Sequence, residues 1–292
     1  MKNLSYQKII FIISMLVFGT IGLFVKYIPL ASSEIALYRA VLASVLIFLF
    51  LIISRRKIPF KVIKKQLPLL FISGVCVGFN WILLFQAYKY TTVSVATLSY
   101  YFAPVLVTLI CPIVFKEKMT LKNWVCFAFS TLGIVLITGI GDLSQGKNHL
   151  IGVLYGLGAA CLYAVVVVIN KFIKNVDGIE RTFLQFLSAI VVLLPFASLS
   201  GGINISTLNG NGLIMLLIVG VVHTGINYCL YFSSLKDLKG QQSAILSYID
   251  PLVAVIISFI ALGENLTTMQ GIGGLLILGF AILNEINFKK KS

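Results

Sequence analysis

The feature that most constrains this chain is a pattern of polar and apolar residues that recurs, without a gap, at a fixed offset of 147 positions. Identical pairs at this offset include Asn80 and Asn227, Phe85 and Phe232, Lys89 and Lys236, Tyr101 and Tyr248, Pro104 and Pro251, Glu117 and Glu264, and Thr120 and Thr267. Hydrophobicity alone does not produce matching Asn, Lys, Pro and Glu residues at one offset. The chain therefore consists of two copies of one unit, which we assign to residues 1–140 and 151–287.

Composition indicates that lipid surrounds most of the chain, because 59% of its residues are hydrophobic and only 11% are charged. Soluble domains carry about a quarter charged residues. A span needs about 20 apolar residues, and we expect ten spans at 8–28, 34–54, 67–88, 93–115, 122–140, 151–173, 180–199, 211–232, 240–262 and 269–287. Isolated strands cannot satisfy their backbone in lipid, so the prediction is an all-α integral membrane protein with ten transmembrane helices.

The distribution of basic residues predicts the orientation of the spans. With the N-terminus in the cytoplasm, 19 Lys and Arg residues lie on the cytoplasmic side and three, Lys26, Lys89 and Lys147, lie outside. Such a bias is typical of cytoplasmic loops, and it places both termini in the cytoplasm and the protein in the cytoplasmic membrane. Nucleic-acid binding does not follow from the net charge of +14, because the charges form short clusters between apolar runs. Five spans per copy predict an inverted repeat.

The residues around the repeated prolines resemble those of a known family. Each half has Pro, then Glu thirteen residues later, then a last span with glycine, and Arg39 with Ala43 gives an Arg-xxx-Ala pattern. The motif residues are Pro104, Glu117 and Gly133 in one half, and Pro251, Glu264, Gly271, Gly273, Gly274 and Gly279 in the other. Over nearly its whole length the chain is similar to the EamA-type branch of the drug/metabolite transporter superfamily. The resemblance implies a ten-helix inverted-repeat fold and transport of a small metabolite, often an amino acid.

The chain departs from the family pattern at one position, in the first span. The two repeated prolines can be interpreted in two ways. Members often have Trp-Gly in the first span, where this chain has Phe18 and Gly19, so contacts of the indole are not carried over. Pro104 and Pro251 remove a backbone donor, which produces either a simple kink or a kink that exposes carbonyls and flexes.

Asp250 is the acid that we expect to matter most. It lies near the middle of the ninth span, where a charge is costly, and its counterpart in the first half is Ala103, so the shared fold does not require it. It either accepts bonds from backbone amides at a broken helix or binds a cation or proton. Arg39 is its candidate counter-ion, and Glu34 is a rival partner for Arg39. Glu264 and Glu117 lie at span ends, where capping or interfacial pairing is expected.

Aromatic and amide side chains near the prolines complete the predicted site. A tyrosine hydroxyl in mid-membrane needs a polar partner, which a cavity supplies. For the two asparagines, hydrogen bonding between helices is an equal alternative, and the histidine is either a bonded structural residue or a proton carrier. The predicted substrate-binding residues are Asn80, Trp81, Tyr100, Tyr101, Tyr163, His223, Asn227, Tyr228, Tyr248 and Asp250, and those with gating or structural roles are Pro104, Pro251 and Arg39.

These features favour a secondary transporter that moves a small polar or amphipathic metabolite, an amino acid or amine, by alternating access, in the direction of export. No nucleotide motif or metal-binding pair occurs in the sequence, so we expect no cofactor and no enzyme activity. The expected partners are the substrate, the bilayer and a coupling proton, and a homodimer remains open. The alternatives are a membrane-embedded enzyme, a non-transporting interaction protein and, less favoured, a channel. An Asp250–Arg39 pair favours a zwitterionic substrate, and a free Asp250 favours a cation.

Overall fold

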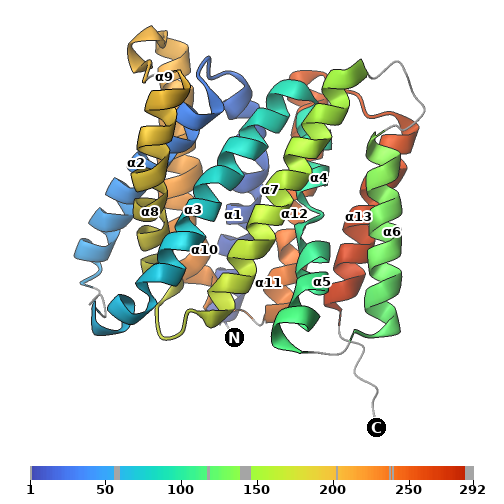
Figure 1. Ribbon diagram of the computed structural model, residues 1–292, viewed down its shortest axis with the longest axis horizontal. Coiled ribbons are helices and arrows are strands. Elements are labelled where there is room, and N and C mark those ends of the chain that lie inside the picture. The colour runs from blue at the N-terminus through green and yellow to red at the C-terminus, as the bar shows by residue number, and fades with distance from the viewer. Residues whose placement is uncertain are drawn as a thin grey trace.

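The computed structural model describes residues 2–55, 60–116, 119–138, 146–201, 203–236, 238 and 240–286, and these residues form helices and no strand (Figure 1). The α-helices are α1 (Lys2–Lys26), α2 (Ser32–Ile53), α3 (Phe60–Tyr90), α4 (Val93–Tyr100), α5 (Ala103–Phe115), α6 (Leu121–Thr138), α7 (Gly146–Phe172), α8 (Gly178–Ser200), α9 (Gly210–Leu217), α10 (Asn227–Leu235), α11 (Gly240–Ser247), α12 (Ile249–Leu262) and α13 (Thr268–Glu285). Ten helical segments of the described chain are long and apolar enough to cross a membrane. The predicted all-α membrane fold with ten spans is confirmed.

Two of the ten spans are broken at corresponding places in the two halves. The fourth span consists of α4 and α5, which are separated at Tyr101 and Phe102, and the ninth consists of α11 and α12, which are separated at Tyr248. Pro104 and Pro251 follow these breaks and lie in the first turn of the next helix. Proline fits there because its fixed φ is helical and the first turn does not need its N–H. Each proline therefore begins a second half-helix.

The eighth span changes its helical geometry in the middle. It starts as α9, continues as a π-helical segment, Ile218–Ile226, and ends as α10. Within the π-helical segment, the hydroxyl of Thr224 donates to the carbonyl of Val219, five residues earlier, at 2.7 Å. Segments of this kind are rare and occur often at functional sites.

The last spans of the two halves, α6 and α13, pack side by side in opposite directions (Figure 1). Asn123, near the start of α6, donates to Asn284, near the end of α13, at 3.0 Å. Gly133 and Gly273 mark the closest approach, because a Cβ on either one would lie within 2.7 Å of the carbonyl oxygen of the other. The two helices can touch at this point only through glycine backbone.

The second spans of the two halves, α2 and α8, also run antiparallel. Phe48, near the end of α2, stacks on Phe183, near the start of α8, with ring centroids 5.9 Å apart. Glu34, at the start of α2, accepts a hydrogen bond from the amide of Asn204, just past the end of α8. The start of α1 and the end of α13 lie at the same end of the bundle, which we call the terminus end (Figure 1).

Some predictions about connections fall at or beyond the limits of the described chain. Glu117, the residues that end the first repeat at 139–140, and residue 287 lie outside the described residues. The second repeat and its first span were expected to begin at residue 151, but α7 begins at Gly146.

Candidate functional site

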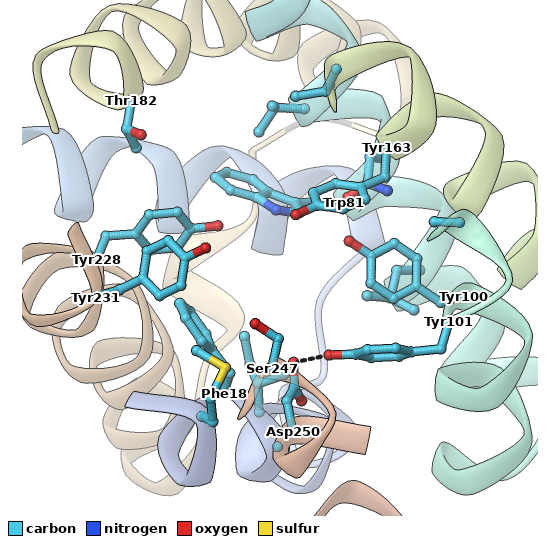
Figure 2. A pocket seen from close by; sticks show the side chains of 18 of the residues that line it. Phe18, Trp81, Tyr100, Tyr101, Tyr163, Thr182, Tyr228, Tyr231, Ser247 and Asp250 are labelled. Carbon is cyan, nitrogen blue, oxygen red and sulfur yellow. Dashed lines mark hydrogen bonds between the residues drawn. The ribbon is translucent and has the colours of Figure 1, made fainter. Parts of the chain in front are cut away.

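A cavity of about 430 Å³ lies where the helices of the two halves meet, and its walls are rich in aromatic side chains (Figure 2). This volume is within the range of small-molecule sites. The aromatic residues in its lining are Phe18, Trp81, Tyr88, Tyr100, Tyr101, Tyr163, Phe186, Tyr228, Tyr231, Phe232 and Tyr248. Ring faces offer apolar and cation-binding surface, and the tyrosine hydroxyls add polar points to it.

Asp250 lies in this cavity, directly after the break in the ninth span. Its Oδ2 accepts a hydrogen bond of 2.5 Å from the hydroxyl of Tyr101, which stands at the break in the fourth span (Figure 2). The ring of Tyr248 lies 6.2 Å from that of Tyr101. The two broken spans therefore face one another, and the acid of the ninth span meets a tyrosine from the fourth.

Arg39 lies in another part of the lining and does not pair with Asp250. Its guanidinium carbon lies 4.2 Å from the centre of the Trp81 ring, and its Nε donates to the Thr224 hydroxyl at 2.6 Å. Glu34 bonds the amides of Ala31 and Asn204 instead. Neither partner expected for Arg39 therefore forms an ion pair with it among the described residues.

Asn80 and Asn227 make equivalent contacts, as their positions in the repeat require. The side-chain amide of Asn80 donates to the carbonyl of Ala159 in α7 at 2.6 Å, and that of Asn227 donates to the carbonyl of Ser14 in α1 at 3.0 Å. Each asparagine thus ties the third span of its own half to the first span of the other half. Asn80 also lines the cavity, whereas Asn227 is not part of the lining.

His223 and Pro251 lie outside the cavity lining. His223 is 2% exposed, and its ring nitrogens lie 2.9 Å from the Thr20 hydroxyl and 3.2 Å from the carbonyl of Ile218. These contacts favour the interpretation of His223 as a hydrogen-bonded structural residue between helices. The remaining predicted residues all line the cavity; they are Asn80, Trp81, Tyr100, Tyr101, Tyr163, Tyr228, Tyr248, Asp250, Pro104 and Arg39.

Sequence reasoning missed several polar residues of the lining. Tyr231 follows Tyr228 by three residues and therefore shares its helix face, a spacing that could have identified it. Thr182 and Arg181 also line the cavity. They carry no signal in the sequence, because ordinary polar residues near span ends are expected at a membrane surface.

Gln185 has the same role in the second half that Arg39 has in the first. It lies in α8, the counterpart of α2, and its amide nitrogen lies 2.5 Å from the Ser73 hydroxyl and 2.9 Å from Asn170 Oδ1. Arg39 similarly reaches Thr224 in the eighth span, the counterpart of the third. The second half thus has a neutral side chain, hydrogen-bonded through its amide nitrogen, where the first has a positive charge.

The cavity extends to the end of the bundle at which the termini lie. Its lining includes Leu235, the last residue of α10, Glu285, the last residue of α13, and Arg181 in the first turn of α8, all half-buried. At the other extreme the lining includes Leu84, Tyr88 and Thr97 instead, and these are buried. The cavity is therefore more accessible from the terminus end.

The opposite end of the bundle is held together around Glu264. This carboxylate forms an ion pair with Lys26, accepts a hydrogen bond from the Val93 amide at 2.8 Å, and accepts another from the Ser258 hydroxyl. The contacts join the end of α1, the start of α4 and the end of α12. The expected pairing of Glu264 at a span end is thus present. Its partner, Lys26, is partly exposed at the surface.

The sequence model of the EamA-like transporter family matches the chain twice, over residues 7–139 and 150–285. The chain belongs to this family. The predicted resemblance to EamA-type proteins of the drug/metabolite transporter superfamily is confirmed, and the protein is a multi-pass membrane transporter.

Two named proteins and one solved structure are similar to the chain over most of its length. The chain is 30% identical over 292 residues to the "uncharacterized transporter YxxF" of Bacillus subtilis, which covers all of this chain and 93% of that protein. It is 27% identical to solute carrier family 35 member G1 of Mus musculus, over 91% of this chain and 74% of that protein. A crystal structure with 16% identity and a TM-score of 0.65 covers 95% of this chain and 96% of the solved one, which shows the shared fold.

Proposed function

We propose that this protein is a secondary transporter that moves a small polar or amphipathic metabolite, an amino acid or an amine, out of the cell. The observation that carries the proposal is the central cavity, whose lining contains Asp250 and Arg39, neither with an oppositely charged partner among the described residues. Insertion scales assign about 2.5–3.5 kcal/mol to such a charge in mid-membrane. A ligand with complementary groups would offset part of that cost.

The other groups in the cavity fit this substrate class. Tyr101, Tyr228 and Tyr231 offer hydroxyls and ring faces, and Asn80 offers an amide. Ammonium groups bind well to carboxylates and over aromatic rings, and an apolar body packs against the same rings. The composition of the lining therefore suits an amphipathic molecule with a charged end better than an inorganic ion.

We propose that the two matched segments form an inverted repeat of five spans each, residues 1–140 and 151–287, around this cavity. Support comes from the antiparallel packing of the equivalent pairs α2 with α8 and α6 with α13, and from the reciprocal bonds of Asn80 and Asn227. Inverted repeats commonly expose one central site to the two sides of a membrane in turn. Alternating access is the mechanism that this arrangement favours.

The structure would correspond to one of two conformers in that cycle. The cavity extends towards the terminus end, and the Glu264 contacts tie three spans together at the opposite end. The Lys and Arg bias places the termini in the cytoplasm of the cell. We therefore assign the conformer as open towards the cytoplasm, in the cytoplasmic membrane, and a substrate that enters from this side is exported.

The driving force in this proposal is the substrate gradient, an exchange of substrates, or a proton. The bonds of His223 to Thr20 and to the Ile218 carbonyl place it away from the cavity, which gives no support to proton carriage by this residue. Asp250 is the lining acid in mid-span, so it is the group that we propose for any coupling proton.

The experiment that tests the proposal is flux in proteoliposomes that contain the purified protein. A panel of radiolabelled amino acids and amines is offered, with Asp250→Asn as the inactive variant and Trp124→Phe, at an exposed surface position, as the matched control. We expect saturable flux of at least one compound, retained in the control and lost in Asp250→Asn. No flux of any compound would contradict the proposal, and a chemically altered product would favour a membrane enzyme instead.

A further inference from the structure

The Arg39 guanidinium is a buried charged group whose charge the contacts described above do not balance. Its side chain is 4% exposed, yet it lines the cavity and has no acidic partner among the described residues. A buried cation without an anion is costly unless something supplies the missing charge. Asp250 and Glu34 do not supply it, and Glu285, the other acid of the lining, lies at the terminus end and forms no ion pair with Arg39 among the described residues. A ligand in the cavity would supply it.

The contacts of Arg39 orient its guanidinium and leave most of its donors unused. Arginine carries five N–H donors, and the recorded hydrogen bond uses only the one on Nε, which donates to Thr224 at 2.6 Å. The Thr224 hydroxyl gives its own hydrogen to the Val219 carbonyl, so its oxygen is free to accept. The Trp81 ring covers one face of the guanidinium at 4.2 Å. The two terminal nitrogens, which form the edge suited to a two-point hydrogen bond, have no acceptor among the described residues.

The repeat indicates that the fold itself does not need this charge. In the second half, Gln185 holds the equivalent helices together through Ser73 and Asn170 and has partners for its amide nitrogen. A neutral side chain is therefore sufficient for packing at this place. The positive charge of Arg39 is an addition in one half only, as is the negative charge of Asp250, whose counterpart is Ala103.

We propose that Arg39, held by Trp81 and Thr224, binds the carboxylate of the transported metabolite, so that the substrate is an amino acid and not a simple amine. The proposal rests on the transport function proposed above and narrows its substrate class. It departs from the sequence expectation that an Asp250 without Arg39 favours a cation, because Arg39 lines the same cavity and also has no ion pair among the described residues. The planar guanidinium matches a carboxylate at two points, which an ammonium group cannot do. Asp250 and the tyrosines around it would then bind the amino group of the same molecule, because the acidic and the basic side chain occupy different parts of one cavity.

The chain contains a built-in probe for this site. Trp81 contacts Arg39, and the other tryptophan, Trp124, is 53% exposed on the outside of the bundle. In a Trp124→Phe protein, Trp81 is the single tryptophan, and its emission reports on what binds beside Arg39. The titrants are the twenty common L-amino acids, and for each one that changes the emission, the matching carboxamide and decarboxylated amine.

The expected result is saturable binding of at least one amino acid, with its carboxamide and amine weaker by about tenfold or more. Arg39→Gln is expected to remove this preference, and Arg39→Lys to keep part of it, because lysine retains the charge without the fork. Equal affinity for acid and carboxamide, a preference that persists in Arg39→Gln, or no response to any amino acid would overturn the proposal.

Two features keep the test decisive. If Arg39→Gln does not accumulate, the comparison of acid with carboxamide in the Arg39-containing protein still decides the question. Flux in proteoliposomes distinguishes failure of this proposal from failure of the transport function. Flux of amines without a preference for the carboxylic acids would contradict the carboxylate site but not the transport function. No flux of any compound would contradict both.

Discussion

Removal of the Glu264 carboxylate is predicted to open the end of the bundle that lies away from the termini. Glu264 contacts Lys26, the Val93 amide and the Ser258 hydroxyl, and so joins α1, α4 and α12. Its own side chain is 9% exposed, but that of Lys26 is 34% exposed, so solvent screens the ion pair. If this contact closes one face in a transport cycle, its loss shifts the population towards the conformer that is open on that face.

The size of the shift follows from the kinds of contact that are lost. A partly exposed ion pair contributes about 0.5–1 kcal/mol, and a hydrogen bond to a charged group contributes about 1.5–3 kcal/mol. Glu264→Gln keeps acceptors and loses the charge, which corresponds to about 1–2 kcal/mol, or about 5- to 30-fold in population. Glu264→Ala loses every side-chain contact, at about 2–4 kcal/mol or about 30-fold and more.

The assay is the rate at which a membrane-impermeant maleimide labels a cysteine at Thr97, a lining residue buried near the closed end. The five native cysteines are first replaced. From the face away from the termini, labelling is expected to accelerate in Glu264→Gln and further in Glu264→Ala. Lys236→Gln, which breaks the ion pair with Asp177 at the other end, is the control and leaves this rate unchanged. Equal rates in Glu264→Ala and the parent would refute the reasoning.

Three further predictions concern the walls of the cavity and the contacts between the halves. Tyr101→Phe removes the donor to Asp250 and is expected to raise the KM for transport about fivefold, since one hydrogen bond contributes about 1 kcal/mol; an unchanged KM would contradict it. Asn227→Ala removes the side-chain hydrogen bond to the Ser14 carbonyl, and should lower the thermal unfolding midpoint in detergent without any change in KM, because Asn227 does not line the cavity. Gly19→Val is expected to lower the yield of folded protein on size-exclusion chromatography, because a Cβ at this position lies 2.5 Å from the Asp250 carbonyl oxygen; a normal yield would show that α1 can move away.

The sequence was sufficient for the span count because apolar segments of this length have few alternatives. It also predicted kinks at Pro104 and Pro251, since proline cannot continue a helix without losing a hydrogen bond. It did not predict that each span breaks just before its proline, because other prolines of the chain, such as Pro68 and Pro195, lie inside helices that continue. The repeat identified Asn80 and Asn227 as twins, but not their acceptors, which are backbone carbonyls of other helices. Every residue has a backbone carbonyl, so the amino-acid sequence does not indicate which one accepts the hydrogen bond.

The partners of Arg39 and Asp250 were beyond the reach of the sequence for a similar reason. Two opposite charges near the middle of a membrane suggest a pair, but which side chains meet depends on how the helices are rotated. The π-helical segment, Ile218–Ile226, affects this rotation by placing Thr224 against Arg39. Its sequence has no proline or other recognisable signal, so both the segment and the contact had to come from the structure.

The measurement that tests the central claim most directly is the sidedness of Lys89 and Lys236, which occupy the same position in the two copies and are both exposed. Each is replaced by cysteine in a protein without other cysteines, and intact cells are treated with an impermeant maleimide. If the copies are inserted in opposite directions around a shared cavity, the cysteine at Lys89 is labelled from outside and the cysteine at Lys236 only after the cells are opened. Labelling of both from the same side would contradict the account.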